Sequence, residues 1–397
     1  MTDLPRIILA NKKQGSLLRF HPWVFSGAIK KIEGDPKDGD IVEVYSVSSE
    51  YLATGHFQAD GSIAVRAFSF KRINPDGDFW KEKIRNAYET RLTEGLADNT
   101  ATNIYRLVHA EGDGLPGLII DVYADTAVIQ CHSIGMYMIK DHLVEALRAC
   151  YGDQLKTIYD KSSETLPKNF AANLTNQCIW GEDKGSVIGV ENGCKYNVDW
   201  FTGQKTGFFI DQRENRKLLG EYSKGKKVLN TFCYSGGFSI AALLNGAKEV
   251  HSLDSSARAL DLVTQNLELN GLQDANHKNI KADAVEYIRE IDVDYDVIVL
   301  DPPAFAKHMS ARHNAVQGYK RLNAQAIKSI KPGGLIFTFS CSQVVDKYMF
   351  NSTVMAAAIE AGREVRILHQ LHQPADHPVN IFHPESEYLK GLVIQVN

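Results

Sequence analysis

The chain has 397 residues, 44% of them hydrophobic and 23% charged, with a formal net charge of -4 at pH 7. This is the composition of a globular protein with room for two or three domains, and its charge gives no general attraction to nucleic acid. No apolar run is long enough to cross a bilayer, and the start lacks the apolar core of a signal peptide, so we expect a cytoplasmic protein. The six cysteines lie singly, without metal-binding spacing, so we expect neither disulfides nor a metal site.

The first 74 residues read as short strands, such as GDIVEVYS, YLATGHFQ and SIAVRAFSF, separated by turn residues. We therefore predict a small β-rich module over residues 1–74. Its first 31 residues contain six lysines and arginines, including Lys12, Lys13 and Arg19, against a single aspartate. Such a segment can bind phosphates, although charge alone favours a solvated face.

A turn-rich boundary at residues 73–78 leads into a second region, predicted as a mixed α+β domain over residues 75–185. Its first helix is predicted over residues 78–96, with Asp78 as the N-cap. The further elements predicted there are strands over 103–110, 118–125 and 127–133 and a helix over 136–152.

From residue 186 to the end, short apolar strands alternate with amphipathic helices. The predicted strands lie at 226–233, 248–254, 281–284, 295–303, 334–341 and 389–396, and the helices at 238–246, 257–271, 285–291, 321–330 and 353–362. Such alternation predicts a mostly parallel, doubly wound α/β sheet, and hence a multi-domain chain.

Ligands bind such a sheet beyond the carboxyl ends of its strands. The turn after the first strand contains Gly236 and Gly237, which let the backbone approach a ligand closely. Asp254 ends the second strand, where an acid can accept hydrogen bonds from ribose hydroxyls, and we expect Asp283 near the adenine of a nucleoside cofactor. The predicted cofactor residues of these strand ends are Asn230, Phe232, Tyr234, Ser235, Gly236, Gly237, Asp254, Ser255, Asp283 and Asp301.

The type of nucleoside follows from the motifs that this turn lacks. It has neither GxGxxG nor the phosphate loop GxxxxGK[ST], and the GDGLPG stretch at 112–117 leads into a predicted strand rather than a helix. A glycine turn without a phosphate cradle fits S-adenosylmethionine, which carries no phosphate. A nicotinamide oxidoreductase is a more distant alternative.

Two further strand ends carry residues that could bind a substrate or take part in catalysis. Asp301, Pro302, Pro303 and Phe305 form a rigid turn that can hold an acid and an aromatic ring beside a flat base. Cys341, in FTFSCSQ, follows the fifth strand of this region. It is either a small residue filling a gap or a nucleophile, and its local sequence does not decide between them.

Together these stretches resemble the large-subunit ribosomal RNA methyltransferase I family, which methylates a cytosine of 23S rRNA at carbon-5. The matching stretches are HPWVFSGAI, RLVHAEGDGLPGLIIDVY, TGQKTGFFIDQRENR, LNTFCYSGGFS, DPPAF, GYKRLNAQAI, FTFSCS, ADHP and EYLKG. The resemblance covers nearly the whole chain. It implies a PUA RNA-binding module at 1–74, a central domain at 75–185 and a Rossmann-like methyltransferase domain at 186–397.

The resemblance also implies the cofactor, the partner and several roles: S-adenosylmethionine as methyl donor, ribosomal RNA as substrate, and Phe208, Asp211 and Arg213 near the cofactor. Cys341 becomes the candidate nucleophile, because a thiolate added to carbon-6 activates carbon-5 of a pyrimidine. Asp301 is expected to bond ring nitrogen-3 and the exocyclic amine.

Many cytosine-5 RNA methyltransferases carry a second cysteine where this chain has Ala304. The base that removes the carbon-5 proton therefore stays open among Lys307, His308 and solvent. We expect Pro302, Pro303 and Phe305 to contact the substrate base, and the basic N-terminal residues to contact RNA.

Two alternatives remain: methylation of an exocyclic or ring nitrogen of a purine in RNA, and a non-catalytic RNA-binding protein. The sequence leaves open which cytosine is modified, whether naked rRNA or an assembled subunit is the substrate, and the oligomeric state, with a homodimer as one option.

Overall fold

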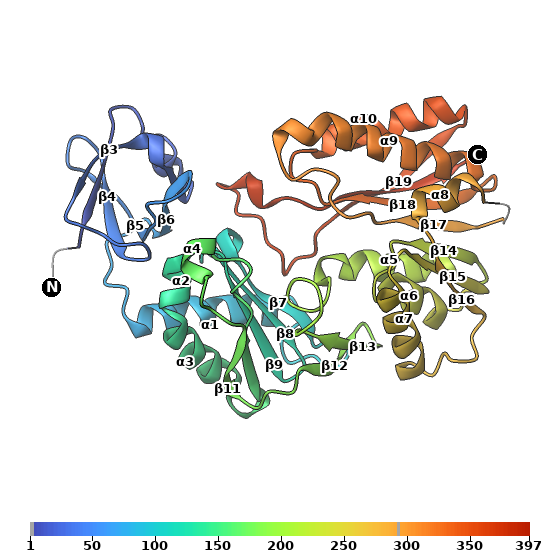
Figure 1. Ribbon diagram of the computed structural model, residues 1–397, viewed down its shortest axis with the longest axis horizontal. Helices are drawn as coiled ribbons and strands as arrows, with labels where there is room; N and C mark the ends of the chain where they lie inside the picture. The colour runs from blue at the N-terminus through green and yellow to red at the C-terminus, as the bar shows by residue number, and fades with distance from the viewer. Residues whose placement is uncertain (1–3, 292–293) are drawn as a thin grey trace. The chain divides into compact units, whose positions relative to one another are not determined.

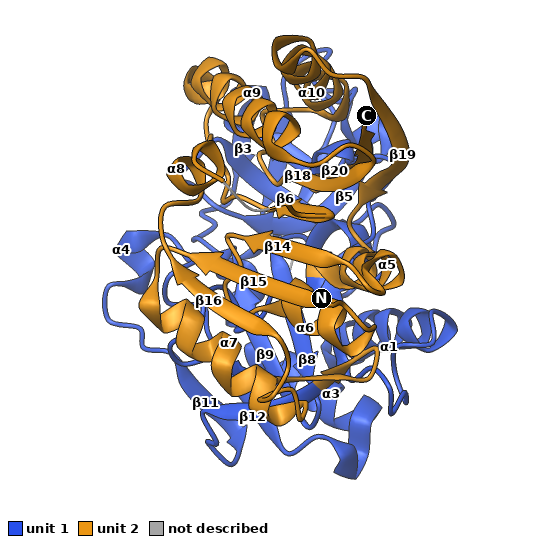
Figure 2. Ribbon diagram, turned by 90° about the vertical axis from the view of Figure 1, so that its right-hand side faces the viewer, with its two compact units in different colours: residues 1–189, 198–210, 375–386 blue, residues 190–197, 211–374, 387–397 orange. Residues whose placement is uncertain are grey.

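The computed structural model describes residues 4–291 and 294–397 of the chain. It divides into two compact units, coloured separately in Figure 2. Unit 1 comprises residues 1–189, 198–210 and 375–386, and unit 2 comprises residues 190–197, 211–374 and 387–397. Each unit therefore gathers segments that are distant in the sequence, and each is described by itself below.

Unit 1 begins with a six-stranded sheet in the order β2-β6-β5-β4-β1-β3. Its strands are β1 (Arg6–Leu9), β2 (Trp23–Phe25), β3 (Ile29–Glu33), β4 (Ile41–Tyr45), β5 (Tyr51–Phe57) and β6 (Ile63–Ser69). The predicted strands over β4, β5 and β6 are confirmed, because their inward side chains, such as Val42, Val44 and Val65, form a buried core. The three strands before them are short and only partly buried, and the sequence pattern missed them.

The second sheet of unit 1 has the order β11-β10-β9-β8-β7 and packs with helices α1 and α3 around one core. Its elements are α1 (Gly77–Thr93), β7 (Ile104–His109), β8 (Leu118–Tyr123), β9 (Thr126–Cys131), α2 (Ile134–Met138), α3 (Lys140–Tyr151), β10 (Thr157–Asp160), α4 (Lys168–Ala171) and β11 (Gln177–Gly181). The single helix predicted over 136–152 is in fact two, α2 and α3, which meet at Ile139.

The predicted N-cap of the first helix was wrong. Asp76, not Asp78, has the extended backbone of a cap, and its carboxylate accepts a 3.0 Å hydrogen bond from the Phe79 N–H. Asp78 lies inside the first turn, where its negative charge favours the positive end of the helix dipole. Both aspartates fit a helix start by composition, and only the backbone angles distinguish them.

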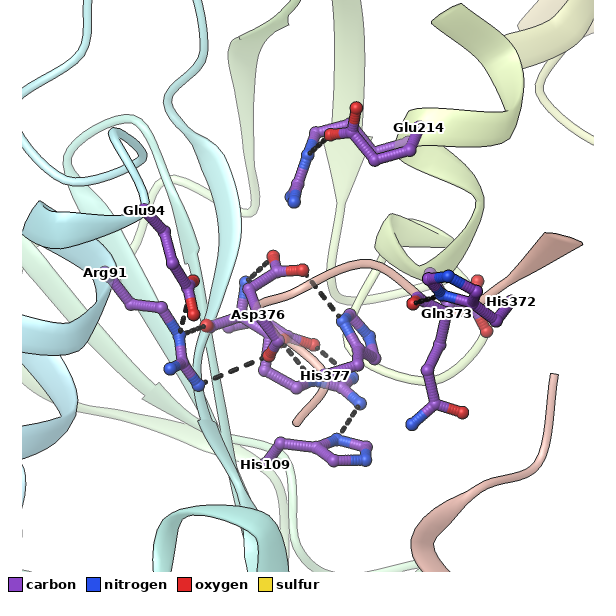
Figure 3. A network of polar contacts seen from close by, with 12 residues as sticks. Arg91, Glu94, His109, Glu214, His372, Gln373, Asp376 and His377 are labelled. Carbon is purple, nitrogen blue, oxygen red and sulfur yellow. Dashed lines mark hydrogen bonds and ion pairs between the residues drawn. The ribbon is translucent and has the colours of Figure 1, made fainter. Parts of the chain in front are cut away.

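The segment 375–386 belongs to unit 1 and is held there by a network of polar contacts, shown in Figure 3. Arg91 donates from Nη2 to Asp113 at 2.7 Å and to the Asp376 carbonyl at 3.3 Å. The Asp376 carboxylate accepts from the Arg106 N–H at 3.0 Å and lies 3.1 Å from Nδ1 of His377. The ADHP stretch thus anchors this connection between β19 and β20.

Unit 2 is built on a seven-stranded sheet in the order β16-β15-β14-β17-β18-β20-β19. All strands are parallel except β20, which runs antiparallel to both of its neighbours, so the predicted mostly parallel sheet is confirmed. Figure 1 shows α5, α6 and α7 on one face and α8, α9 and α10 on the other. This two-sided cover explains why the central strands β17 and β18 are wholly buried.

The elements of unit 2 are α5 (Arg213–Ser223), β14 (Lys227–Thr231), α6 (Gly237–Leu244), β15 (Glu249–Asp254), α7 (Ala257–Leu269), β16 (His277–Lys281), α8 (Ala284–Arg289), β17 (Val297–Leu300), α9 (Arg312–Ser329), β18 (Gly334–Ser340), α10 (Lys347–Ala361), β19 (Val365–His372) and β20 (Lys390–Val396). A two-stranded hairpin, β12 (Ser186–Glu191) and β13 (Cys194–Asp199), precedes them. In the described part of the chain, no helix is both long and apolar enough to span a membrane.

Two features of this sheet differ from expectation. The third strand lies at β16, before the predicted residues 281–284, because Asp283 caps helix α8 instead of extending the strand. The edge strand β19 was missed, because most of its side chains are exposed or half-buried and it lacks an apolar pattern.

Candidate active site

The strand ends that carry the predicted site residues lie at one edge of the sheet. In the register of β14, β15, β17 and β18, Thr231 pairs with Leu253 and with Leu300, and Leu300 pairs with Thr338. Asp254 ends β15, and the residues that follow the other strands include the glycine turn, Asp301 and Cys341. The pairing of these parallel strands therefore brings these residues to the carboxyl edge of the sheet, as predicted.

The glycine turn has an unusual backbone. Phe232, Tyr234 and Gly236 all have positive φ angles, of 54°, 45° and 77°. For the two aromatic residues this conformation costs on the order of 1 kcal/mol or more each, so the surrounding contacts must hold it. The Tyr234 N–H donates to Asp254 at 3.1 Å, and the Ser235 carbonyl accepts from Asn266 Nδ2 at 2.8 Å.

Asp254 is positioned by the turn it supports. Its Oδ2 accepts from the Tyr234 N–H, and its Oδ1 accepts from the Ser256 N–H at 2.9 Å. A carboxylate has about four acceptor positions, so both oxygens can accept further hydrogen bonds from a diol. Ser255, the next residue, is exposed.

Asn230 lies at the base of this turn and is buried. Its Nδ2 donates to Ser239 at 2.9 Å, while its Oδ1 has no hydrogen-bond partner among residues 4–291 and 294–397. A buried acceptor without a partner is costly, which makes this amide a candidate for binding a ligand.

Asp283 has a structural task that the sequence did not reveal. Its Oδ1 accepts from the Val285 and Glu286 N–H groups and so caps helix α8. Its place after β16 is compatible with the predicted contact to an adenine, which stays a prediction.

The three residues assigned by resemblance belong to different units. Asp211 and Arg213 lie in unit 2 and are buried, and Phe208 is buried in unit 1. Asp211 accepts a 2.8 Å hydrogen bond from the Tyr388 hydroxyl. Arg213 Nε lies 3.0 Å from the Glu214 carboxylate. Their proximity to a cofactor stays a prediction.

The turn from Asp301 to Phe305 is packed against helix α9. The Phe305 ring lies 4.6 Å from that of Tyr319, and a Cβ atom on Gly318 would lie 2.9 Å from the Phe305 ring. One side of the Phe305 ring is therefore covered by protein. Only the exposed part of the ring could make the predicted stacking contact with a base. Pro302 is buried, whereas Pro303 is exposed.

Cys341 is half-buried, between two buried serines. Ser342 links it to the neighbouring turn, because its Oγ lies 3.0 Å from the Tyr319 hydroxyl and accepts from the Ala306 N–H at 3.4 Å. Cys131 and Cys233, by contrast, are buried, and burial raises the pKa of the Cys131 thiol to about 12. Of these three thiols, the one at the end of β18 is thus the most exposed, as a reactive thiol should be.

Lys390 is a further candidate site residue, which the sequence analysis did not single out. It opens strand β20, and its side chain is buried beside the segment that follows β18. Its Nζ donates to the Ser342 carbonyl at 2.7 Å and to the Tyr388 carbonyl at 2.8 Å. The available signal was a lysine within the otherwise apolar run LKGLVIQV.

The basic N-terminal residues Lys12, Lys13 and Arg19 are all exposed and belong to unit 1. Their exposure is compatible with binding phosphates and equally with a solvated face. Their contact with RNA stays a prediction.

One group of described side chains, His21, His383 and Glu385, has ligand atoms close enough to hold a metal ion. The Trp23 N–H donates to Nδ1 of His21 at 3.2 Å, so the proton of a neutral His21 ring lies on Nε2, the atom that faces Glu385 at 3.5 Å. A proton on Nε2 leaves no lone pair there, so this tautomer disfavours a metal at Nε2.

Gly236→Ala is expected to lower both stability and cofactor affinity. The added Cβ would lie 3.0 Å from Val263 at a φ of +77°, which together should cost about 1–2 kcal/mol and displace the turn. Calorimetric melting and titration with S-adenosylmethionine measure the two effects. Gly271→Ala is the matched control, because Gly271 also has a positive φ but nothing lies within 4 Å of the added Cβ. Equal cofactor affinity in the two variants would contradict this role of the turn.

Comparison with known proteins identifies the class. Residues 165–384 match the family model of S-adenosylmethionine-dependent methyltransferases, and residues 7–70 match a PUA-like domain. These two matches agree with the order of the sheet and with a glycine turn that lacks a phosphate-binding motif. The chain is therefore a methyltransferase that uses S-adenosylmethionine and carries an N-terminal PUA-like domain.

The particular family follows from the curated relatives. The chain is 41% identical over 395 residues to Ribosomal RNA large subunit methyltransferase I of Aeromonas hydrophila subsp. hydrophila, and the match covers 98% of each chain. The chain therefore belongs to the ribosomal RNA large subunit methyltransferase I family.

Solved structures agree with this assignment. A SAM-dependent methyltransferase from Streptococcus mutans is 26% identical, with a TM-score of 0.83 over 98% of this chain and 100% of its own. A second methyltransferase, solved in complex with SAH, is also 26% identical, with a TM-score of 0.84 and the same coverage.

The residues at the carboxyl edge fit S-adenosylmethionine. Asp254 offers an oriented carboxylate for a ribose diol, and Asn230 offers a buried acceptor without a protein partner. The glycine turn supplies close backbone approach, and the motifs that cradle phosphate are absent from this turn. These hydrogen-bond acceptors match the hydroxyl groups of a nucleoside without phosphates.

Proposed function

We propose that this protein methylates carbon-5 of a cytosine in large-subunit ribosomal RNA, with Cys341 as the nucleophile. The proposal is carried by the half-buried thiol at the carboxyl edge of β18, which Ser342 joins to the turn that contains Asp301. An enzyme that methylates an amine has no need of a thiol there.

Carbon-5 of cytosine is a poor nucleophile, and covalent catalysis removes that difficulty. The Cys341 thiolate adds to carbon-6, which forms a sulfur–carbon bond and makes carbon-5 electron-rich. When bound, S-adenosylmethionine would supply an electrophilic methyl group to carbon-5, and S-adenosylhomocysteine would leave with the electron pair of the broken sulfur–methyl bond. A base removes the carbon-5 proton, the electron pair returns to the ring, and the sulfur–carbon bond breaks to release the thiolate.

Asp301 is proposed to bind the pairing edge of the base. Its carboxylate would accept hydrogen bonds from the exocyclic amine and from a protonated nitrogen-3. Such bonds favour the pyrimidine protonated at nitrogen-3, and that proton neutralises the negative charge that enters the ring as sulfur adds. Pro302, Pro303 and the exposed part of Phe305 would bound the same pocket.

Transfer of labelled methyl groups to rRNA, followed by nucleoside analysis, tests the function. We expect the label in 5-methylcytidine. A label in methylated adenosine or guanosine would contradict the proposal. It would identify a purine nitrogen as the target instead. Protein without rRNA serves as the control for self-labelling.

A further inference from the structure

A buried lysine opens an otherwise apolar strand. Lys390 is the first residue of β20, which lies between β18 and β19, and its side chain is only 8% exposed. Burying an ammonium group costs several kcal/mol unless hydrogen bonds and nearby charge compensate it. A residue of this kind in the sheet interior therefore needs an explanation beyond packing.

Its backbone and side chain both contact the neighbours of Cys341. In the antiparallel register, Lys390 pairs with Ser340, the residue before the thiol. Its Nζ donates to the carbonyl of Ser342, the residue after the thiol, at 2.7 Å, and to that of Tyr388 at 2.8 Å. The lysine thus holds the backbone on both sides of Cys341.

Both of these hydrogen-bond acceptors are neutral carbonyl oxygens, so neither supplies a negative charge to the Lys390 ammonium. An ammonium has three hydrogens, and the two carbonyls account for two of them. Burial lowers the pKa of Lys390 from 10.5 to about 8, and the largest opposing influence is the negative charge of a Cys341 thiolate, ahead of Glu387 and Asp346. With Nζ at 2.7 Å from the Ser342 carbonyl, the ammonium lies beside the segment that carries the sulfur.

Other titratable groups face this pair. Glu387 and Asp346 act on Lys390 from the flanking segments, His372 of β19 pairs with it across the sheet, and Tyr319 of α9 interacts with Cys341. Asp346 also caps helix α10, and its Oδ1 accepts from the Met349 N–H.

We propose that Lys390 is the positioning residue for the Cys341 thiol. Its ammonium fixes the backbone after β18 through the Ser342 carbonyl and stabilises the thiolate with its third hydrogen and its charge. This assignment rests on the proposed role of Cys341 as the nucleophile. It gives the buried ammonium an opposite charge when the thiol ionises.

Alkylation of Cys341 by iodoacetamide, followed by peptide mass spectrometry across pH in the full chain, tests the coupling. In Lys390→Met the rate is expected to rise at a pH higher by about one unit or more, so that alkylation at pH 7 slows about tenfold, because the loss of a neighbouring opposite charge shifts the ionisation of a thiol by about that amount. Lys390→Arg keeps the charge and is expected to stay near the native profile. Cys150 and Cys178, both half-buried, report the general reactivity in the same digest.

Lys248→Met is the matched control. Lys248 is exposed and precedes β15, at the opposite edge of the sheet, so the same charge is lost without contact to the thiol. Binding of S-adenosylmethionine by each variant reports an intact fold.

An unchanged Cys341 profile in Lys390→Met that still binds cofactor would overturn the proposal, and equal shifts in the Met and Arg variants would reduce the lysine to a packing role. The assay needs no RNA. It therefore stays informative even if nucleoside analysis refutes cytosine as the target.

Discussion

Cys341→Ala is expected to lose methyl transfer to rRNA by about a thousandfold or more, which corresponds to about 4 kcal/mol in the activation barrier. Without the thiolate, carbon-6 receives no nucleophile and carbon-5 stays unreactive. Affinity for S-adenosylmethionine should be retained, because Cys341 lies after β18 whereas the glycine turn follows β14. Single-turnover transfer of labelled methyl groups and calorimetric titration measure the two quantities.

The matched control is Cys178→Ala, which removes a half-buried thiol of β11 in unit 1 and should leave transfer near its native rate. If Cys341→Ala keeps substantial activity, the covalent mechanism is wrong. The methyl group would then go to a nitrogen of a purine, a reaction that needs an acid and an aromatic residue but no cysteine.

Asp254→Asn is expected to weaken the binding of S-adenosylmethionine by about a hundredfold or more. Both carboxylate oxygens accept from backbone N–H groups, of Tyr234 and Ser256. An asparagine has a single acceptor oxygen, so its NH₂ group would oppose one of these donors and displace the turn. It also loses the charge that strengthens hydrogen bonds to a diol, each worth about 1.5–3 kcal/mol. Calorimetric titration with the cofactor measures the loss.

The neighbouring variant Ser255→Ala provides the comparison, because Ser255 is exposed and should have little influence. Cofactor affinity within threefold of native for Asp254→Asn would remove Asp254 from the binding site. A melting temperature for each variant separates lost binding from lost folding.

Local sequence patterns were enough to predict much of the fold of this protein and of its candidate site. The alternation of apolar strands and amphipathic helices predicted the parallel sheet of unit 2, and the confirmed class and family follow from stretches such as the glycine turn and DPPAF. The same rule placed Cys341 and Asp301 at one edge of the sheet. These inferences succeed because the periodicity of strands and helices can be read from short windows of sequence.

The tertiary structure decided what depends on partners distant in the chain. Lys390 and Ser342 are 48 residues apart, and only the antiparallel pairing of β20 with β18 brings the ammonium beside the thiol segment. Packing on Tyr319 covers one side of Phe305, and backbone angles select Asp76 as the cap of α1. The physical reason is that hydrogen-bond geometry and burial depend on which residues are neighbours in three dimensions. The residue type alone determines only which hydrogen bonds a side chain is able to form.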